Sequence, residues 1–180
     1  MPRNEVRVVV LFEDDEHEYL LRRLVGRLHL HPVRFEKCTD CNGVLARVGL
    51  EVDALRRKKH QKNLGLVVVI DADGPTREKR LAHIEAIVAG LGGGARAGEE
   101  RIAFVIPAWE IETWYVHLCC PESRPVDESR GDYKSDAAWR RLKTELGSAA
   151  KRAADAWLPE NGRVDPASLV AARDELKRLA

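Results

Sequence analysis

The sequence predicts an α/β protein whose mostly parallel sheet is flanked by helices and followed by a C-terminal helical extension. Two observations support this class. Short aliphatic runs alternate with longer segments in which apolar residues recur every three or four positions, as strands alternate with amphipathic helices. The aliphatic runs are apolar at nearly every position, which is typical of parallel strands that are buried on both faces.

The alternating elements can be placed in order along the first two thirds of the chain. Four strands are predicted, at residues 6–12, 33–35, 66–70 and 102–106. Four helices are predicted, at residues 16–28, 44–57, from about Pro75 to the glycines of 90–94, and 111–118. The glycine-rich segment 90–98 lacks the strand–glycine–helix order of a phosphate-binding loop, so we expect an ordinary loop there.

The character of the chain changes near residue 121. Residues 121–134 are polar, contain proline and are predicted to form a loop. Three helices without an intervening strand are predicted beyond it, at residues 135–146, 148–157 and 166–179. We therefore expect an α/β domain at 1–134 and a helical extension at 135–180, which packs on that domain or docks from it.

The charge balance narrows the classes of function. The chain has 180 residues, with 30 Lys and Arg, 29 Asp and Glu, and a net charge of +1. A protein that coats DNA unaided is strongly basic, so this class is excluded. The apolar runs are too short to span a bilayer and the opening residues lack a signal-peptide pattern, so we expect a soluble cytoplasmic protein with no membrane partner.

The four cysteines are expected to be reduced thiols in a cytoplasmic protein. They form a C-x-x-C pair, Cys38 and Cys41, and an adjacent pair, Cys119 and Cys120. Two adjacent cysteines rarely point both sulfur atoms at one ion, so the spacing is unusual for zinc. A zinc site at Cys38 and Cys41 remains an open alternative, since the histidines at positions 29 and 31 are near in sequence.

Acidic residues follow three of the predicted strands. Glu13 begins an acidic run after the first strand, Asp71 and Asp73 follow the third, and Glu110 and Glu112 follow the fourth. The carboxyl ends of parallel strands share one edge of a sheet, so we expect these groups to converge. Converging carboxylates require a compensating cation, and oxygen ligands suit Mg²⁺ or Mn²⁺. The Asp-x-Asp spacing would let both aspartates face the same ion.

Helix capping is an alternative role for some of these acids. Asp73 could cap the helix near Pro75, and Asp15 could cap the first helix. Capping does not account for Asp71 or Glu13, each of which directly follows a buried strand. We therefore favour a metal site for the set.

Two families share paired acids after the first strand. In the response-regulator receiver domain, which the segment VVVLFEDDE resembles, Asp71 would be the residue that accepts a phosphoryl group. That family also has a Ser or Thr after the next strand and a Lys after the following one. Here the strand at 102–106 leads into Pro107, Ala108 and Trp109, without a hydroxyl group.

The Toprim domain of topoisomerases, primases and overcoming-lysogenization-defect nucleases fits better. VVVLFE, ending at Glu13, and VVVIDAD, with Asp71 and Asp73, resemble its glutamate and its D-x-D. Small Toprim-like proteins also share the later I-E-T-W segment at 111–114. The resemblance covers residues 6–135 and departs from the Toprim motif at Asp14, which stands where the family has glycine.

This resemblance implies a Toprim-like, Rossmann-type fold and metal-dependent hydrolysis of phosphodiester bonds in DNA or RNA. Asp71 and Asp73 would hold Mg²⁺ or Mn²⁺. Glu13 would bind a metal or act as the general base toward a metal-bound water, and Glu112 would complete the coordination.

The resemblance also implies roles for basic residues and for partners. Lys134 and Arg80 would contact phosphate, while Glu18 and His17 are weaker site candidates. Relatives are associated with ATPases in anti-phage defence, so an ATPase subunit or a second copy of the chain is an expected partner. The competing hypothesis is a catalytically inactive Toprim-like subunit that docks such a partner, which Asp14 and the balanced charge favour.

Overall fold

A parallel sheet organises the molecule, as the alternation of strands and helices predicts. The computed structural model describes residues 6–58, 61, 63–74, 76–123, 126–160 and 162–179. Within these residues the sheet has four strands, β1 (Arg7–Phe12), β2 (His31–Lys37), β3 (Leu64–Val69) and β4 (Ile102–Val105). Their order is β2-β1-β3-β4 and all neighbours pair in parallel. The predicted α/β class is confirmed.

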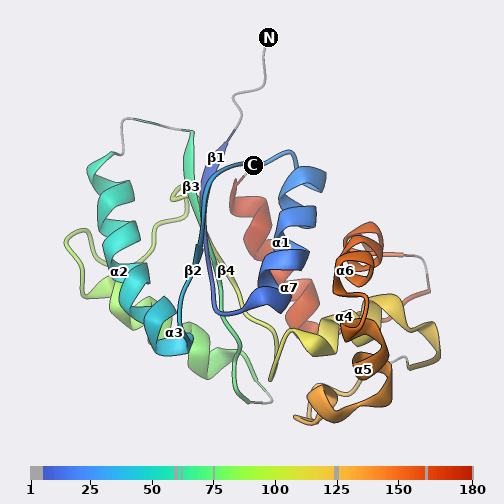
Figure 1. Ribbon diagram of the computed structural model, residues 1–180. Helices are drawn as coiled ribbons and strands as arrows, with labels where there is room; N and C mark the ends of the chain where they lie inside the picture. The colour runs from blue at the N-terminus through green and yellow to red at the C-terminus, as the bar shows by residue number, and fades with distance from the viewer. Residues whose placement is uncertain are drawn as a thin grey trace.

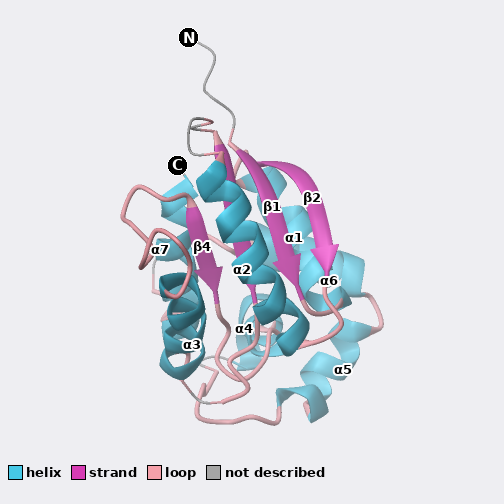
Figure 2. Ribbon diagram, turned by 90° about the vertical axis from the view of Figure 1, so that its left-hand side faces the viewer, coloured by secondary structure: helices cyan, strands magenta, loops and turns pink. Residues whose placement is uncertain are grey.

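Helices cover both faces of this sheet (Figures 1 and 2). One face packs against α2 (Cys41–Arg57) and α3 (Glu78–Ala89), and the other against α1 (Asp15–Arg27) and α4 (Glu112–Cys119). Alternate residues of a strand enter the two cores: in β3, Val67 and Val69 face α1, while Leu66 and Val68 face α2. Since both faces are buried there, β1, β3 and β4 are nearly continuous apolar runs.

The second strand is longer than the predicted 33–35 and includes Pro32. It lies at one edge of the sheet, where a proline is tolerated because the missing N–H costs no ladder bond. The register shifts between Val8 and Val9 of β1 opposite this segment, which accommodates one extra residue in β2.

The two predicted helix caps are wrong. Asp14, not Asp15, caps α1, because its side chain accepts the N–H of His17. Asp15 instead pairs with Lys37. Asp73 does not cap α3, which begins at Glu78 after Arg77 and has no side-chain cap. Pro75, where that helix is predicted to begin, lies outside the described residues.

Three further helices follow α4, as predicted: α5 (Ala137–Lys143), α6 (Leu146–Asp155) and α7 (Ala167–Leu176). Their apolar residues belong to the same buried cluster as β1 and α1. Trp157, after α6, packs edge-to-face on Trp114 of α4. Glu175 of α7 accepts the N–H of Phe104, on the edge strand β4. No described helix is long and apolar enough to cross a membrane.

Candidate functional site

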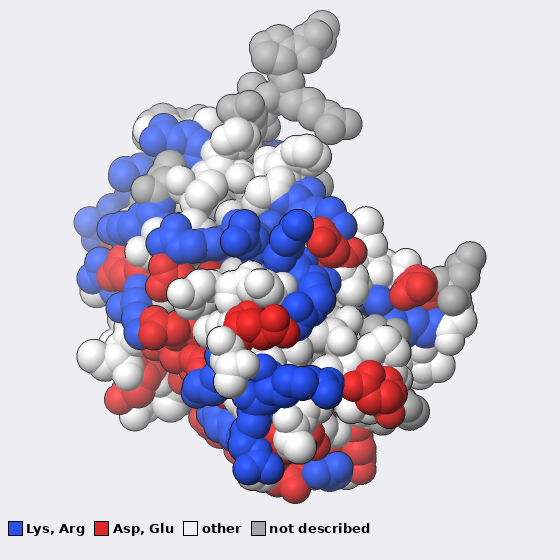
Figure 3. All heavy atoms as spheres, turned by 45° about the vertical axis from the view of Figure 1, so that its right-hand side comes forward, with Lys and Arg blue, Asp and Glu red and all other residues white. Residues whose placement is uncertain are grey.

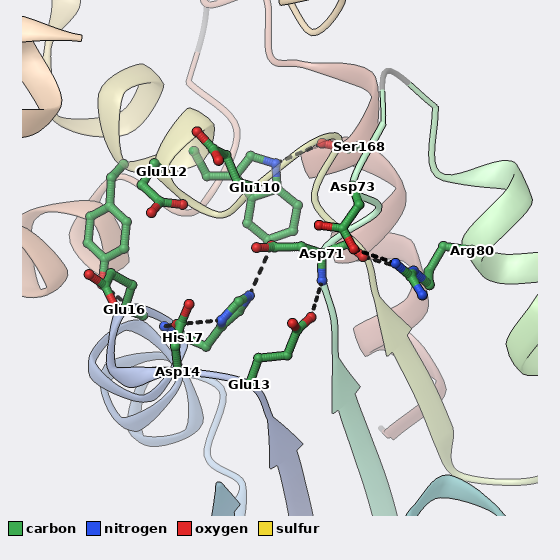
Figure 4. Close-up of polar contacts among 12 residues, drawn as sticks. Glu13, Asp14, Glu16, His17, Asp71, Asp73, Arg80, Glu110, Glu112 and Ser168 are labelled. Carbon is green, nitrogen blue, oxygen red and sulfur yellow. Dashed lines mark hydrogen bonds and ion pairs between the residues drawn. The ribbon is translucent and has the colours of Figure 1, made fainter. Parts of the chain in front are cut away.

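The site lies where the strand order reverses. After β1 the chain crosses to β2 on one side, whereas β3 leads to β4 on the other. The carboxyl ends of β1 and β3 therefore border the crevice in which open α/β sheets bind ligands. Glu13 and Asp14 follow β1, and Asp71 follows β3, so all three meet at this crevice (Figure 4).

A buried histidine joins two of these acids. The first turn of α1 carries His17, whose ring is fully buried. Its Nδ1 lies 2.7 Å from Oδ1 of Asp14, and its Nε2 lies 3.1 Å from Oδ1 of Asp71. His, Cys, Asp and Glu side chains can each offer an atom to a metal ion. Among the residues that the structure describes, one group of three such atoms lies within 4.8 Å of one another, and it consists of Asp14, His17 and Asp71.

The histidine supplies positive charge to this group. Burial opposes its protonation, but the charge of Asp71 and the hydrogen bonds to both aspartates raise the pKa of His17 well above its usual value. Burial likewise disfavours the charge of Asp14, yet the hydrogen bonds and charge of His17 lower the pKa of Asp14 to about 2. The chain itself therefore provides a cation to two of the converging acids.

Two glutamates of the site lie where their charge is disfavoured. Glu13 accepts the backbone N–H of Asp71 at 2.8 Å, but burial raises the pKa of Glu13 to about 7. Glu112, in the first turn of α4, is buried and its Oε2 has no hydrogen-bond partner in the described part of the chain. Burial, together with repulsion from Asp71, raises the pKa of Glu112 to about 8. A bound cation would favour the charged form of both glutamates.

Lys134 lies at the rim of the site. Its Nζ is 3.2 Å from Oε2 of Glu110 and 3.9 Å from Oε1 of Glu112, and its backbone N–H donates to Glu110 Oε1. Burial opposes the charge, but the two glutamates raise the pKa of Lys134. Its side chain is 57% exposed, so the charged end is accessible to a ligand.

Asp73 lies outside the group of Asp14, His17 and Asp71, and the expectation that Asp71 and Asp73 face one ion stays a prediction. Its backbone is left-handed (φ 52°), and its carboxylate lies 2.5 Å from Arg80 on the outer side of the loop (Figure 4). The turn is held by backbone hydrogen bonds to Trp109, which is also left-handed (φ 56°). Arg80 also donates to the carbonyl of Asp71, so it braces the loop rather than facing His17.

Other predicted groups lie apart from the site. Glu18 pairs with Arg22 on α1. Cys38 and Cys41 are free thiols and belong to no group of three candidate ligands among the described residues. Basic residues are dense at positions 56–62, where the end of α2 lies. Of these, Arg56 pairs with Glu100, and residues 59, 60 and 62 lie outside the described part.

The central position of His17 was not apparent from the sequence. The sequence marked His17 only as a weaker site candidate. A local signal for its contact with Asp14 is their spacing of three residues at a helix start, where a cap binds the N–H of the third helical residue. The contact between His17 and Asp71 spans 54 residues and depends on the pairing of β1 with β3. Comparisons of the chain with family models, with curated proteins and with solved structures give no match.

Proposed function

We propose that the protein is a divalent-metal-dependent nuclease of the Toprim-like class. The observation that carries the proposal is the set of acids at the switch point, in which Asp71 and Glu112 are buried and Glu13 is half-buried. Burial raises the pKa of Glu13 to about 7 and that of Glu112 to about 8. Folded proteins hold several desolvated carboxyl groups together at a high cost, and such groups cluster at functional sites. The order of the motifs along the chain, which resembles that of Toprim nucleases, supports the same class.

The residues at the crevice fit a divalent ion. Asp71 would supply oxygen ligands, and Glu13 would either bind the metal or act as the general base. Glu112 has a buried oxygen without a partner among the described residues. When bound, Mg²⁺ or Mn²⁺ would neutralise charge on the phosphate and lower the pKa of a water. The pKa of Glu13, about 7, suits a general base that takes a proton from that water near neutral pH. Lys134 would hold a non-bridging phosphate oxygen from the rim.

Nucleic acid, DNA or RNA, is the proposed substrate, and a partner would supply much of the affinity. On the face seen in Figure 3, bands of Lys and Arg are interrupted by Asp and Glu, without a single-sign field. Such a surface gives little counterion release on nucleic acid. An ATPase subunit or a second copy of the chain, as the Toprim-like resemblance implies, would deliver the substrate to the crevice.

Metal-dependent cleavage tests the proposal. Plasmid DNA, single-stranded DNA and RNA are incubated with the protein in Mg²⁺, in Mn²⁺ or in EDTA. We expect cleavage only with a metal, and we expect Asp71→Asn and Glu13→Gln to lose more than the roughly 10–100-fold that removal of an outer-shell partner costs. Asp15→Asn is the control, because this adjacent acid faces Lys37. Cleavage that persists in Asp71→Asn, or no cleavage of any substrate, contradicts the proposal.

A non-catalytic Toprim-like subunit is the second candidate. The observation that favours it is His17, which already offers charge and hydrogen bonds to Asp14 and Asp71 without a metal. In that case Asp71→Asn would leave binding to the partner ATPase unchanged, and no metal would bind. The receiver hypothesis has less support. A residue that accepts a phosphoryl group must be accessible, but Asp71 is only 5% exposed. In addition, Pro107 lies after β4, where a receiver domain has a Ser or Thr.

A further inference from the structure

The two nitrogen atoms of His17 face different surroundings. Nδ1 contacts Asp14, which is fixed as the cap of α1, whereas Nε2 points to Asp71 at the end of β3 (Figure 4). We propose that Nε2 of His17 is itself a metal ligand, so that the site takes a first-row transition ion such as Mn²⁺ in preference to Mg²⁺. This inference rests on the metal site of the proposed function and specifies its ligands and its ion.

The distances suit coordination by Nε2 and Asp71 together. These two atoms are 3.1 Å apart. Adjacent ligands of an octahedral ion with bonds of about 2.1 Å lie about 3.0 Å apart. An ion could therefore replace the proton between Nε2 of His17 and Asp71, which passes to solvent, while both side chains stay near their present positions.

Asp14 completes the usual surroundings of a histidine ligand. Histidines that bind metals donate their second ring N–H to a carboxylate or carbonyl, which fixes the ring and the tautomer. Asp14 Oδ1 lies 2.7 Å from Nδ1 and also accepts the backbone N–H of His17. The carboxylate is thereby held in place by the backbone of the helix that carries the histidine.

A buried oxygen of Glu112 without a partner among the described residues indicates that a cation can bind near His17 and Asp71. Glu112 is 2% exposed, and its Oε2 has no hydrogen-bond partner in the part of the chain that the structure describes. In Figure 4 its carboxylate extends from α4 toward the side on which Asp71 and His17 lie, although Glu112 is outside the group of ligand atoms within 4.8 Å. An ion bound there would satisfy this oxygen, which a structural histidine bridge between Asp14 and Asp71 leaves unsatisfied.

The donor set determines which ion is preferred. Mg²⁺ is bound mainly by oxygen atoms and keeps several waters, whereas an imidazole nitrogen adds affinity for first-row transition ions, least for Mn²⁺ and more for Fe²⁺ and Zn²⁺. The predicted D-x-D arrangement would use oxygen alone. With Asp73 paired to Arg80 outside the group and His17 inside it, the site has mixed nitrogen and oxygen donors.

Electron paramagnetic resonance on the full chain with Mn²⁺ tests the inference without an activity assay. We expect one bound Mn²⁺ whose electron spin couples to a ¹⁴N nucleus, and we expect the coupling to change to that of ¹⁵N when the protein is made with ¹⁵N-labelled histidine. An excess of Mg²⁺ of about 100-fold should leave most of the Mn²⁺ bound. Because labelling changes no residue, this result does not depend on whether a His17 variant folds.

Two variants assign the nitrogen. His17→Gln should remove the coupling and most of the preference for Mn²⁺. Asp14→Asn keeps a good helix cap, so it should retain the coupling but weaken Mn²⁺ binding by roughly 10–100-fold. The matched control is His83→Gln, in α3 on the opposite side of the sheet. It should change neither the nitrogen coupling nor the affinity for Mn²⁺.

The outcomes separate this inference from the proposed function. Bound Mn²⁺ without histidine coupling overturns the inference and leaves a nuclease with an all-oxygen site. A coupling that persists in folded His17→Gln also overturns it, because the nitrogen then belongs to another histidine. Histidine coupling without cleavage of any nucleic acid supports the inference and overturns the nuclease. Absence of Mn²⁺ binding overturns both.

Discussion

Glu112 shows how much the folded site disfavours negative charge. Its carboxyl group lies in the first turn of α4, almost fully buried, with one oxygen unpartnered among the described residues and Lys134 at 3.9 Å from the other. Burial raises its pKa from 4.5 to about 8. A group whose pKa is higher in the folded protein than in the unfolded chain stabilises the fold at low pH, and this contribution is lost as pH rises through the folded value.

The raised pKa of Glu112 predicts how the stability of the metal-free protein depends on pH. Between about pH 5 and 8 the unfolded chain loses the proton of Glu112 and the folded protein keeps it, so the free energy of unfolding should fall by up to about 1.4 kcal/mol per pH unit. Glu112→Gln should remove this part of the slope. Urea unfolding in EDTA across this range measures it, with Glu18→Gln as control. An unchanged slope in Glu112→Gln would show that Glu112 does not titrate there.

At the scale of elements, one carboxylate joins α4, α7 and the segment between α6 and α7. Asp165 accepts from Nε2 of His117 at 2.8 Å, from Nε of Arg163 at 2.6 Å and from Nη1 of Arg173 at 2.6 Å. Burial opposes its charge, but these three partners lower the pKa of Asp165 to about 2. Arg163 and Arg173 are themselves almost fully buried, so both positive charges depend on Asp165 as a counter-ion.

Removal of Asp165 should therefore leave buried positive charge without its counter-ion. We expect Asp165→Ala to lower the free energy of unfolding by about 3–5 kcal/mol. The control is Asp155→Ala at the end of α6, whose exposed pair with Arg27 should be worth at most about 1 kcal/mol. Chemical denaturation of both variants at neutral pH measures the difference. Equal losses in the two variants would contradict the role given to Asp165.

At the scale of the whole molecule, the helices after residue 134 share the core of the sheet. The alanines of α6 and Trp157 lie in the same buried cluster as β1, α1 and Trp114. On α7, Leu169 and Ala172 belong to it as well. Glu175 satisfies a backbone N–H at the open edge of β4 and binds Arg96. The last quarter of the chain thus closes one face of the sheet and one of its edges.

A chain shortened to residues 1–134 should therefore fail to form a cooperative fold. The loss of α5, α6 and α7 would expose the apolar faces of α1 and α4 to water, at about 25 cal/mol for each Å². Circular dichroism with thermal unfolding, together with amide hydrogen exchange, compares the shortened and full chains. A sharp transition and protected amides in the shortened chain would contradict this expectation.

The positions of the elements could be predicted because their patterns are local. β1 and β3 are apolar runs whose alternate residues enter two cores, and the stripe of α1 needs only its own spacing. The placement of Glu13 and Asp71 at one edge also followed from the sequence, since each directly follows such a strand and parallel strands end together.

The composition of the site depended instead on contacts between distant segments. Asp73 turns toward Arg80 because its backbone is left-handed and is held by hydrogen bonds to Trp109. The spacing of residues in the sequence does not predict this backbone conformation. His17 meets Asp71 across 54 residues only when β1 and β3 are paired. The sequence by itself thus specified where the acids gather, through strand ends and helix periodicity. The packing of α1, β3 and α4 decided which of these acids face one another. It also decided that a histidine lies between two of them.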